Sequence, residues 1–230
     1  MDGIRAVIFD LDGCLVDSEI MSLETLADEL AAEGVSTSID ELRQRFLGVS
    51  IQSIVTHFAK ASDRVVLPDF TRRFEDRLLA RYPADLRCIP GATALLDGLK
   101  ARGIAVAIAT GGSLRRLGTT LKVSGLADRF TDLAFSADQV ANGKPAPDLF
   151  LLAASRLEVP PAACAVMEDS PHGIAGARAA GMHAVGFVGG SHLLGMRADH
   201  ACRLKDVGAA DVLEDLSGML QALLNPPRTP

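Results

Sequence analysis

Two kinds of hydrophobic pattern alternate along most of this 230-residue chain. Short runs in which nearly every residue is apolar, such as Arg5 to Phe9, are typical of strands in a parallel sheet that is covered on both faces. Similar runs lie at 104–110, 132–136, 164–169, 183–188 and, more weakly, 210–214. Segments with the period of amphipathic helices lie between these runs, at 91–103, 113–125, 147–157 and 171–181. The alternation of strand and helix predicts an α/β fold built on a parallel sheet.

The interval between the first two predicted strands breaks this alternation. It contains no strand pattern, but four segments with helical periodicity occur there, at 18–34, 38–48, 51–61 and 69–82. A crossover between parallel strands ordinarily holds one helix, so four predicted helices indicate a separate helical unit. We therefore expect a four-helix subdomain over residues 18–86, inserted into an α/β core made of residues 1–17 and 87–230.

The composition favours the same fold and argues against several functions. Apolar residues make up 48% of the chain and aromatic residues 4%, with no Trp, so the core must be mainly aliphatic. The net charge of −6 argues against a nucleic-acid partner, because such proteins usually carry a basic face, but it leaves an anionic substrate open. No apolar run approaches the roughly 20 residues that a membrane-spanning helix needs, so no membrane partner is expected.

The cysteines indicate a reducing environment. Cys14, Cys88, Cys164 and Cys202 are far apart and form no C-x-x-C pair. Together with the absence of a signal-peptide pattern, this spacing favours free thiols and a cytoplasmic location. Four of the histidines show no metal-ligand spacing, namely His57, His183, His192 and His200.

Residues that can carry chemistry follow several of the predicted strands. Ligands of open α/β sheets bind at the carboxyl ends of the strands, and these ends share one edge of the sheet. The sequence places eight such residues at or near that edge: Asp10, Asp12, Thr110, Gly111, Gly112, Lys144, Glu168 and Asp169. Each of them alone also fits an ordinary loop, turn or helix cap. Together they need a strong positive charge, because carboxylates about 4 Å apart repel by about 4 kcal/mol per pair at an effective dielectric constant of 20.

A divalent cation would offset this repulsion. Mg²⁺ is the expected cofactor, because it prefers oxygen ligands, accepts few carboxylates and keeps several of its waters. We expect Asp10 and Asp169 to bind the ion directly, Glu168 to assist through water, and Asp12 to face the ion with its backbone carbonyl.

The same residues suit phosphoryl transfer, which needs a nucleophile, a proton donor and charge compensation at one point. In this interpretation Asp10 is the nucleophile and forms an aspartyl-phosphate. Asp12 protonates the leaving oxygen and then activates a water molecule. Four groups would bind the phosphoryl oxygens: Thr110, the amides of Gly111 and Gly112, and Lys144.

Four segments of the chain resemble, in order and spacing, the motifs of the haloacid dehalogenase superfamily of phosphatases. They read "FDLDGCLVDSE", "TGGS", "GKPAPD" and "MEDSPHGIAGARAAGM". The resemblance spans the whole predicted core. It implies Mg²⁺-dependent hydrolysis of phosphate monoesters, a Rossmann-like doubly wound core and a helical cap inserted after the first strand. It also implies hinges near residues 17–19 and 86–89.

Within this superfamily the chain is most similar to the sugar-phosphate branch, which contains β-phosphoglucomutase and enzymes like 6-phosphogluconate phosphatase. The segments that carry this similarity are "RFLGVS" in the helical insertion and "GFVGGSH" late in the core. Mutases of this branch typically carry a His and an Arg where this chain has Ser22 and Ile51, so hydrolysis is favoured over intramolecular transfer. The resemblance also implies a cap loop that touches the substrate, formed by Gly48, Val49 and Ser50.

The expected function is therefore hydrolysis of a small phosphorylated metabolite, a sugar or sugar-acid phosphate, by a monomeric Mg²⁺-dependent phosphatase. A dehalogenase is disfavoured, because halide departure needs no proton from a second acid such as Asp12. Two alternatives remain: a β-phosphoglucomutase-like phosphotransferase, and a catalytically silent binding protein on the same scaffold. Six arginines of the helical insertion either face solvent or reach a second anionic group of the substrate, namely Arg43, Arg45, Arg72, Arg73, Arg77 and Arg81.

Overall fold

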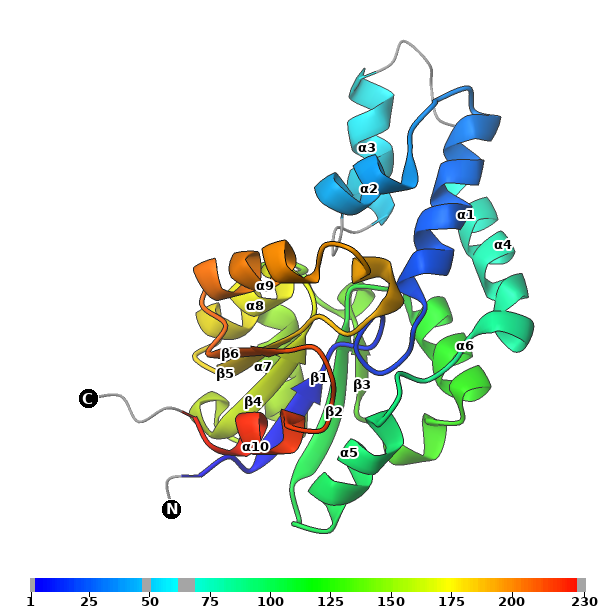
Figure 1. The fold of residues 1–230 in the computed structure, drawn as a ribbon. Coiled ribbons are helices and arrows are strands. Elements are labelled where there is room, and N and C mark those ends of the chain that lie inside the picture. The colour runs from blue at the N-terminus through cyan, green and yellow to red at the C-terminus, as the bar shows by residue number, and fades with distance from the viewer. Residues whose placement is uncertain (1–2, 47–50, 62–68, 227–230) are drawn as a thin grey trace.

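The computed structural model describes residues 3–46, 51–61 and 69–226. Within these ranges six parallel strands form one sheet in the order β3-β2-β1-β4-β5-β6 (Figure 1). The strands are β1 (Ala6–Phe9), β2 (Ala105–Thr110), β3 (Ala134–Ser136), β4 (Cys164–Glu168), β5 (His183–Phe187) and β6 (Asp211–Leu213). All six strands that the sequence predicts are confirmed. The strand order reverses between β1 and β4, and in doubly wound sheets ligands bind at such a switch point.

Helices occupy most of the segments that the sequence predicts as helical. Their bounds are α1 (Glu19–Ala32), α2 (Ile39–Phe46), α3 (Ile51–Ala61), α4 (Phe70–Asp85), α5 (Ala92–Lys100), α6 (Leu114–Ser124), α7 (Asp148–Arg156), α8 (Pro171–Ala179), α9 (Arg197–Asp206) and α10 (Met219–Leu224). Short 3₁₀ helices are η1 (Ala127–Arg129), η2 (Ala137–Gln139), η3 (Pro161–Ala163) and η4 (Ser191–Leu193). The sequence pattern does not predict α9 and α10. In α9 the buried residues are His200 and Leu204, which is too few for a clear helical period.

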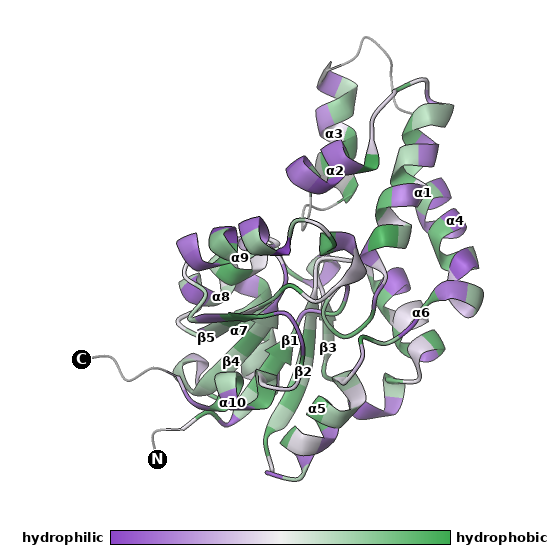
Figure 2. Cartoon of the chain, viewed as in Figure 1, coloured by the Kyte–Doolittle hydropathy of each residue, from purple (hydrophilic) through white to green (hydrophobic). Residues whose placement is uncertain are grey.

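Both faces of the sheet are covered by helices (Figure 1). Val7 and Phe9 of β1 belong to a hydrophobic cluster with residues of α5, α6 and α10. Ala6 and Ile8 belong to a second cluster with residues of α7, α8 and α9. Figure 2 shows the central strands as mainly hydrophobic elements beneath more polar helices. The strands read as unbroken apolar runs because residues on both of their faces are buried.

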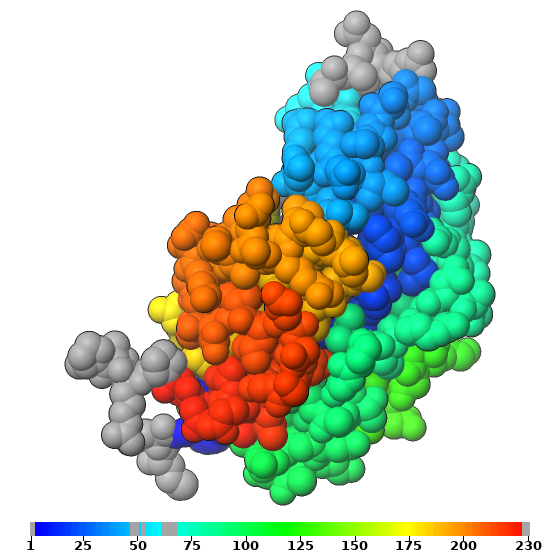
Figure 3. Space-filling model, in the orientation of Figure 1, coloured from blue at the N-terminus to red at the C-terminus, as the bar shows by residue number. Residues whose placement is uncertain are grey.

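The four helices α1 to α4 follow β1, where the sequence predicts a helical insertion. They lie together beyond one end of the sheet (Figure 1), and Figure 3 shows them seated on the rest of the molecule. Ion pairs join α4 to α1 and the turn after it: Arg73 Nη2 lies 2.6 Å from Glu33 Oε1, and Arg77 Nε lies 3.0 Å from Glu29 Oε1. The four predicted helices are confirmed. That this segment acts as a separate cap domain stays a prediction.

The two linkers between the helical insertion and the sheet run side by side. Val16 and Cys88 form an antiparallel bridge, and the N–H of Asp17 donates to the carbonyl of Arg87 over 2.9 Å. The carboxylate of Asp17 accepts hydrogen bonds from the backbone N–H and the hydroxyl of Ser191, over 3.0 and 2.9 Å. The chain therefore enters and leaves the insertion at one place, next to η4, and this place includes the residues predicted as hinges.

No helix within residues 3–46, 51–61 and 69–226 is both long enough and apolar enough to cross a membrane. The four cysteines all lie in these ranges, and each is a free thiol.

Candidate active site

β1 delivers Asp10 to the switch point of the sheet. The N–H of Asp10 donates to the carbonyl of Met167 in β4 over 3.0 Å, so the loop after β1 stays attached to the neighbouring strand. Gly13 in this loop has a φ of +78°, and its N–H donates to the carbonyl of Val16 over 2.8 Å. A Cβ at Gly13 would lie 2.1 Å from Oδ2 of Asp169. Glycine is therefore required both for this turn and for the close approach to Asp169.

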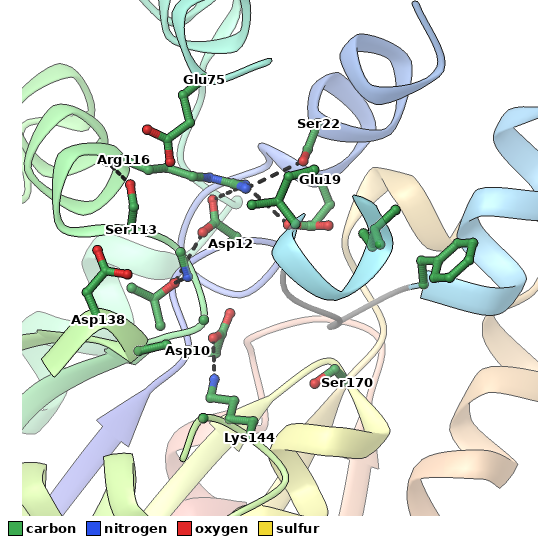
Figure 4. Close-up of a pocket in the computed structure, with 18 of the residues that line it drawn as sticks. Asp10, Asp12, Glu19, Ser22, Glu75, Ser113, Arg116, Asp138, Lys144 and Ser170 are labelled. Carbon is green, nitrogen blue, oxygen red and sulfur yellow. Dashed lines mark hydrogen bonds and ion pairs between the residues drawn. The ribbon is translucent and has the colours of Figure 1, made fainter. Parts of the chain in front are cut away.

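Lys144 lies between two carboxylates. Its Nζ donates to Asp10 Oδ1 over 2.5 Å and also to Glu168 Oε1, and Figure 4 shows Lys144 pointing at Asp10. Only 6% of the Lys144 side chain is exposed. Burial lowers the pKa of Lys144, but the charges of Asp10 and Glu168 outweigh it and raise this pKa above its usual value. The lysine therefore stays protonated and supplies one positive charge to two buried acids.

Glu168 ends β4 and is wholly buried. Its Oε2 accepts hydrogen bonds from the N–H and the hydroxyl of Ser170, both over 3.0 Å, while Oε1 accepts from Lys144. Ser170 also caps α8, because its hydroxyl accepts from the N–H of Gly173. A Cβ at Gly173 would lie 1.9 Å from the Glu168 carboxylate, so this glycine makes room for the acid. Glu168 thus has partners for both oxygens, and a role in metal binding through water stays a prediction.

Asp10 and Asp169 offer a place for a cation beside this network. One ligand atom each from Asp10, Cys14 and Asp169 lies within 4.8 Å of the other two, and all three residues are buried. Oδ2 of Asp169 has no hydrogen bond among the described residues, although it lies 3.1 Å from Nε2 of His192. Burial, reinforced by nearby carboxylates, raises the pKa of Cys14 well above its usual value, so its sulfur stays protonated. The usable ligands are therefore carboxylate oxygens, which fit a hard divalent cation such as Mg²⁺.

The charges around Asp10 also favour a bound divalent cation. Burial raises the pKa of Asp10 well above its usual range; Lys144 opposes this shift, and Glu168, Asp169 and Asp12 reinforce it. An ionised Asp10 therefore needs more positive charge than Lys144 alone supplies. A divalent cation between Asp10 and Asp169 would provide that charge.

Asp12 faces a different set of partners. Its Oδ1 accepts hydrogen bonds from Ser18 Oγ over 2.5 Å and from Arg116 Nη2 over 2.7 Å. Its Oδ2 accepts from Thr110 Oγ1 over 3.3 Å. Asp12 is 8% exposed and lines the same cavity as Asp10. The two acids predicted to share the reaction thus lie in one cavity but have separate hydrogen-bond networks.

Arg116 is the main residue of this site that the sequence analysis does not identify. It lies in the first turn of α6 and reaches α1 of the helical insertion (Figure 4). Its Nη2 lies 3.3 Å from Glu19 Oε1, and its Nη1 donates to Ser22 Oγ over 3.4 Å. Burial raises the pKa of Glu19, and the charge of Arg116 opposes that shift. In the sequence Arg116 follows another arginine in an amphipathic helix, and this pattern is typical of a solvent-facing surface.

The predicted phosphate-binding turn follows β2. Thr110 is 2% exposed, and its hydroxyl accepts a hydrogen bond from the N–H of Gly112 over 3.1 Å while donating to Asp12. The carbonyl of Gly112 accepts from Ser136 Oγ over 2.6 Å, which holds the turn on the end of β3. A Cβ at Gly111 would meet no heavy atom within 4 Å, so the space beside this backbone is open. Phosphate binding by Thr110, Gly111 and Gly112 stays a prediction.

Two histidines contact Asp169 and are a second omission of the sequence analysis. His192 is 0% exposed and lies against the carboxylate, as described above, while Nε2 of His200 lies 2.6 Å from the carbonyl oxygen of Asp169. A carbonyl can only accept, so His200 Nε2 carries the proton in this contact. These histidines hold Asp169 in place instead of forming a metal cluster of their own. Their spacing in the sequence therefore gives no metal signal.

A cavity of about 420 Å³ contains these groups, and this volume is typical of small-molecule sites. Asp10, Asp12 and Lys144 line its core side, and side chains of the helical insertion such as Phe46 and Phe74 line the other. Figure 4 shows the acids and Arg116 directed into the space between the two parts. The predicted substrate loop of Gly48, Val49 and Ser50 lies outside the described residues.

A doubly wound α/β fold with buried acids at its switch point defines a class of enzymes that act on ligands at the carboxyl ends of the strands. Residues 4–181 match the family model of haloacid dehalogenase-like hydrolases, which covers well over half of the chain. The chain belongs to this family of hydrolases.

Several proteins are similar to this chain in sequence. β-Phosphoglucomutase of Bacillus subtilis is 33% identical over 203 residues, which cover 84% of this chain and 87% of that protein. Hexitol phosphatase A of Escherichia coli is 32% identical over 182 residues, covering 79% and 82%. The chloroplastic protein SUPPRESSOR OF QUENCHING 1 of Arabidopsis thaliana is 34% identical over 186 residues, and the match spans 79% of this chain but only 18% of that longer protein.

A solved structure agrees with these sequence matches. The haloacid dehalogenase family hydrolase of Deinococcus radiodurans, determined with bound phosphate and sodium, is 34% identical to this chain. It covers 99% of this chain and 100% of its own, with a TM-score of 0.74. The described fold is therefore that of a family member across nearly the full chain.

Proposed function

We propose that this hydrolase is a Mg²⁺-dependent phosphatase that releases phosphate from a small phosphorylated metabolite, a sugar or sugar-acid phosphate. The observation that carries the proposal is the hydrogen bond between Lys144 and Asp10, next to Asp169, at the base of a cavity of metabolite size. In this proposal residues 18–86 form a cap, and the cavity lies between the cap and the core.

The reaction would have two steps, formation of an aspartyl-phosphate and its hydrolysis. An oxygen of Asp10 attacks phosphorus, the bond from phosphorus to the leaving oxygen breaks, and Asp12 gives its proton to that oxygen. Asp12 then takes a proton from water, and the resulting hydroxide attacks the aspartyl-phosphate, which returns Asp10 as a carboxylate and releases phosphate. Lys144 offsets the charge of Asp10 and of the phosphoryl oxygens throughout.

Asp10 and Asp169 would hold the Mg²⁺ ion, because their oxygens meet in a buried cluster and Oδ2 of Asp169 makes no hydrogen bond among the described residues. The bound ion supplies charge neutralisation for the phosphoryl group and its nucleophile. His192 and His200 would keep Asp169 oriented for this role.

The names of the relatives support sugar phosphates as substrates, since they include a hexitol phosphatase and a β-phosphoglucomutase. The mutase also keeps a phosphotransferase as the second candidate. Ile51 lines the cavity at the place where such a mutase would need a cationic side chain for a second phosphate, and this favours hydrolysis.

The test is phosphate release from a panel of sugar phosphates and from 4-nitrophenyl phosphate, with Mg²⁺ and with EDTA. We expect release with Mg²⁺, none with EDTA, and none from the Asp10→Asn variant under either condition. Isomerised sugar phosphate in place of free phosphate would identify a mutase. Normal turnover by the Asp10→Asn variant would refute the assigned nucleophile.

A further inference from the structure

The charges that line the cavity are predominantly negative. Among the described residues, six acids line it: Asp10, Asp12, Glu19, Glu75, Asp138 and Asp169. The basic residues among the same lining residues are Lys144 and Arg116. Even with a divalent cation bound, a ligand in this cavity meets more negative than positive charge.

Both basic groups are already paired. Lys144 lies at the end of the cavity that would hold the phosphoryl group, here called the phosphoryl end, and it pairs there with Asp10 and Glu168. Arg116 Nη2 lies 2.7 Å from Asp12 and 3.3 Å from Glu19, so its single charge is shared by two carboxylates. Beyond the phosphoryl end, the described lining therefore offers an incoming anion no cation that is free of an acid.

The six arginines of the helical insertion that the structure describes do not change this balance. They pair with acids of their own segment: Arg43 with Asp40, Arg45 with Glu41, Arg72 with Asp69 and Asp76, Arg73 with Glu29 and Glu33, Arg77 with Glu29, and Arg81 with Glu24. None of the six is among the described residues that line the cavity. The sequence between residues 47 and 53, around the predicted substrate loop, also contains no Lys or Arg.

The opposite wall of the cavity can contact both the hydroxyl groups and the apolar carbon skeleton of a ligand. Its apolar part comes from the helical insertion and includes Leu23, Leu26, Phe46, Ile54 and Phe74. Its polar part includes Ser22, Thr71 and the carboxylates of Glu19 and Glu75. Carboxylates accept hydrogen bonds from hydroxyl groups, whereas they repel a second anion that comes close to them.

We infer that the leaving group of the substrate is an uncharged polyol or sugar, and that a carboxylate or a second phosphate on it is rejected. This inference rests on the proposed phosphatase activity and selects among its substrates. It excludes the sugar-acid phosphates that the sequence alone leaves open.

Two matched pairs of substrates test the inference with the wild-type protein and Mg²⁺. Glucitol 6-phosphate and 6-phosphogluconate are open chains that differ at one terminal carbon, which carries a hydroxyl in the first and a carboxylate in the second. Fructose 6-phosphate and fructose 1,6-bisphosphate differ by one phosphate. We expect kcat/KM to be at least about tenfold higher for the neutral member of each pair, since about 1.4 kcal/mol of repulsion is enough for a tenfold difference.

The outcomes separate this inference from the proposed function. Equal or higher kcat/KM for the anionic members overturns the inference and leaves the phosphatase assignment intact. Inertness toward all four esters and 4-nitrophenyl phosphate refutes the phosphatase assignment and the inference with it.

A variant pair tests the physical cause. Glu75 lies in α4, is 8% exposed, and among the described residues it pairs with Arg115, at 3.9 Å. Glu75→Gln removes one lining charge at constant shape, so the preference for glucitol 6-phosphate over 6-phosphogluconate should fall about threefold or more. Asp76→Asn is the control, because the neighbouring Asp76 binds Arg115 over 2.6 Å and is not a lining residue. A preference that Glu75→Gln leaves unchanged, or that Asp76→Asn lowers equally, overturns the electrostatic basis of the inference.

Discussion

Arg116 binds the carboxylate of Asp12 with 2.7 Å between Nη2 and Oδ1, although the two residues lie on different elements far apart in the chain. Ser18 and Thr110 complete the contacts of Asp12, so its carboxylate is held from three directions. Under the proposed mechanism Asp12 is the proton donor. Arg116 is then a positioning residue that sets where this proton donor points.

Replacement of Arg116 should affect substrates according to their leaving groups. In Arg116→Met the carboxylate of Asp12 loses its strongest donor, and we expect kcat for a sugar phosphate to fall by about 10²-fold. An aryl phosphate leaves without protonation, so kcat for 4-nitrophenyl phosphate should fall much less. Steady-state kinetics with both substrates measures the difference. Equal losses for both would mean that Arg116 only maintains the structure of the site.

Asp12→Asn should show the same dependence on the leaving group, with a larger loss. The amide cannot give up a proton to the leaving oxygen, so sugar-phosphate turnover should fall by about 10²–10⁴-fold. Binding of Mg²⁺, measured by calorimetry, should stay close to that of the wild type, because Asp10 and Asp169 are unchanged. Loss of Mg²⁺ binding would instead place the side chain of Asp12 among the ligands. The double variant with Arg116→Met should lose little more than Asp12→Asn alone, since both changes act on one group.

Lys144 should be important for stability as well as for catalysis. Lys144→Met leaves Asp10 and Glu168 buried without their shared cation, and this should lower the free energy of unfolding by about 3–5 kcal/mol. Adding Glu168→Gln should restore part of that loss, because the amide oxygen still accepts from Ser170 and one buried charge is gone. Urea unfolding in EDTA measures both effects. Lys100→Met, at an exposed lysine of α5, is the control and should change stability little.

The sequence predicts the sheet well because each strand is buried on both faces. In β1 all of the residues from Ala6 to Phe9 are buried, and an unbroken apolar run is the direct consequence. In α9 the opposite holds, since its buried residues are His200 and Leu204, and a histidine does not register in a hydrophobic pattern. A helix with so narrow a buried face leaves little trace in the hydrophobic pattern.

The sequence predicts the site residues that lie at strand ends, and it misses those that only tertiary packing brings together. The carboxyl ends of parallel strands share an edge, so Asp10 and Asp169 are expected to meet before any coordinates are known. Arg116 and Glu19 meet because the long side chain of Arg116 reaches from the start of α6 to the start of α1, and this contact depends on how the helical insertion packs. No local pattern reports such packing. The burial of His192 against Asp169 likewise depends on tertiary structure.

A substitution at Gly13 tests the cation site without replacing any proposed ligand of the ion. Gly13→Ala should cost about 1–2 kcal/mol of stability, because a Cβ is unfavourable at a φ of +78°. The new Cβ would also lie 2.1 Å from Asp169 Oδ2 and 2.8 Å from His192 Cε1, so Asp169 must move. We therefore expect Mg²⁺ affinity, measured by calorimetry, to fall at least about tenfold, with a matching loss of turnover at limiting Mg²⁺.

Gly181→Ala separates the two effects of that substitution. Gly181 has a nearly equal φ of +75°, but a Cβ there would meet no heavy atom within 4 Å. It should lose a similar amount of stability while keeping the Mg²⁺ affinity and turnover of the wild type. If Gly13→Ala binds Mg²⁺ as tightly as Gly181→Ala does, then Asp169 is not a ligand of the ion, and the cation must be held elsewhere on the edge of the sheet.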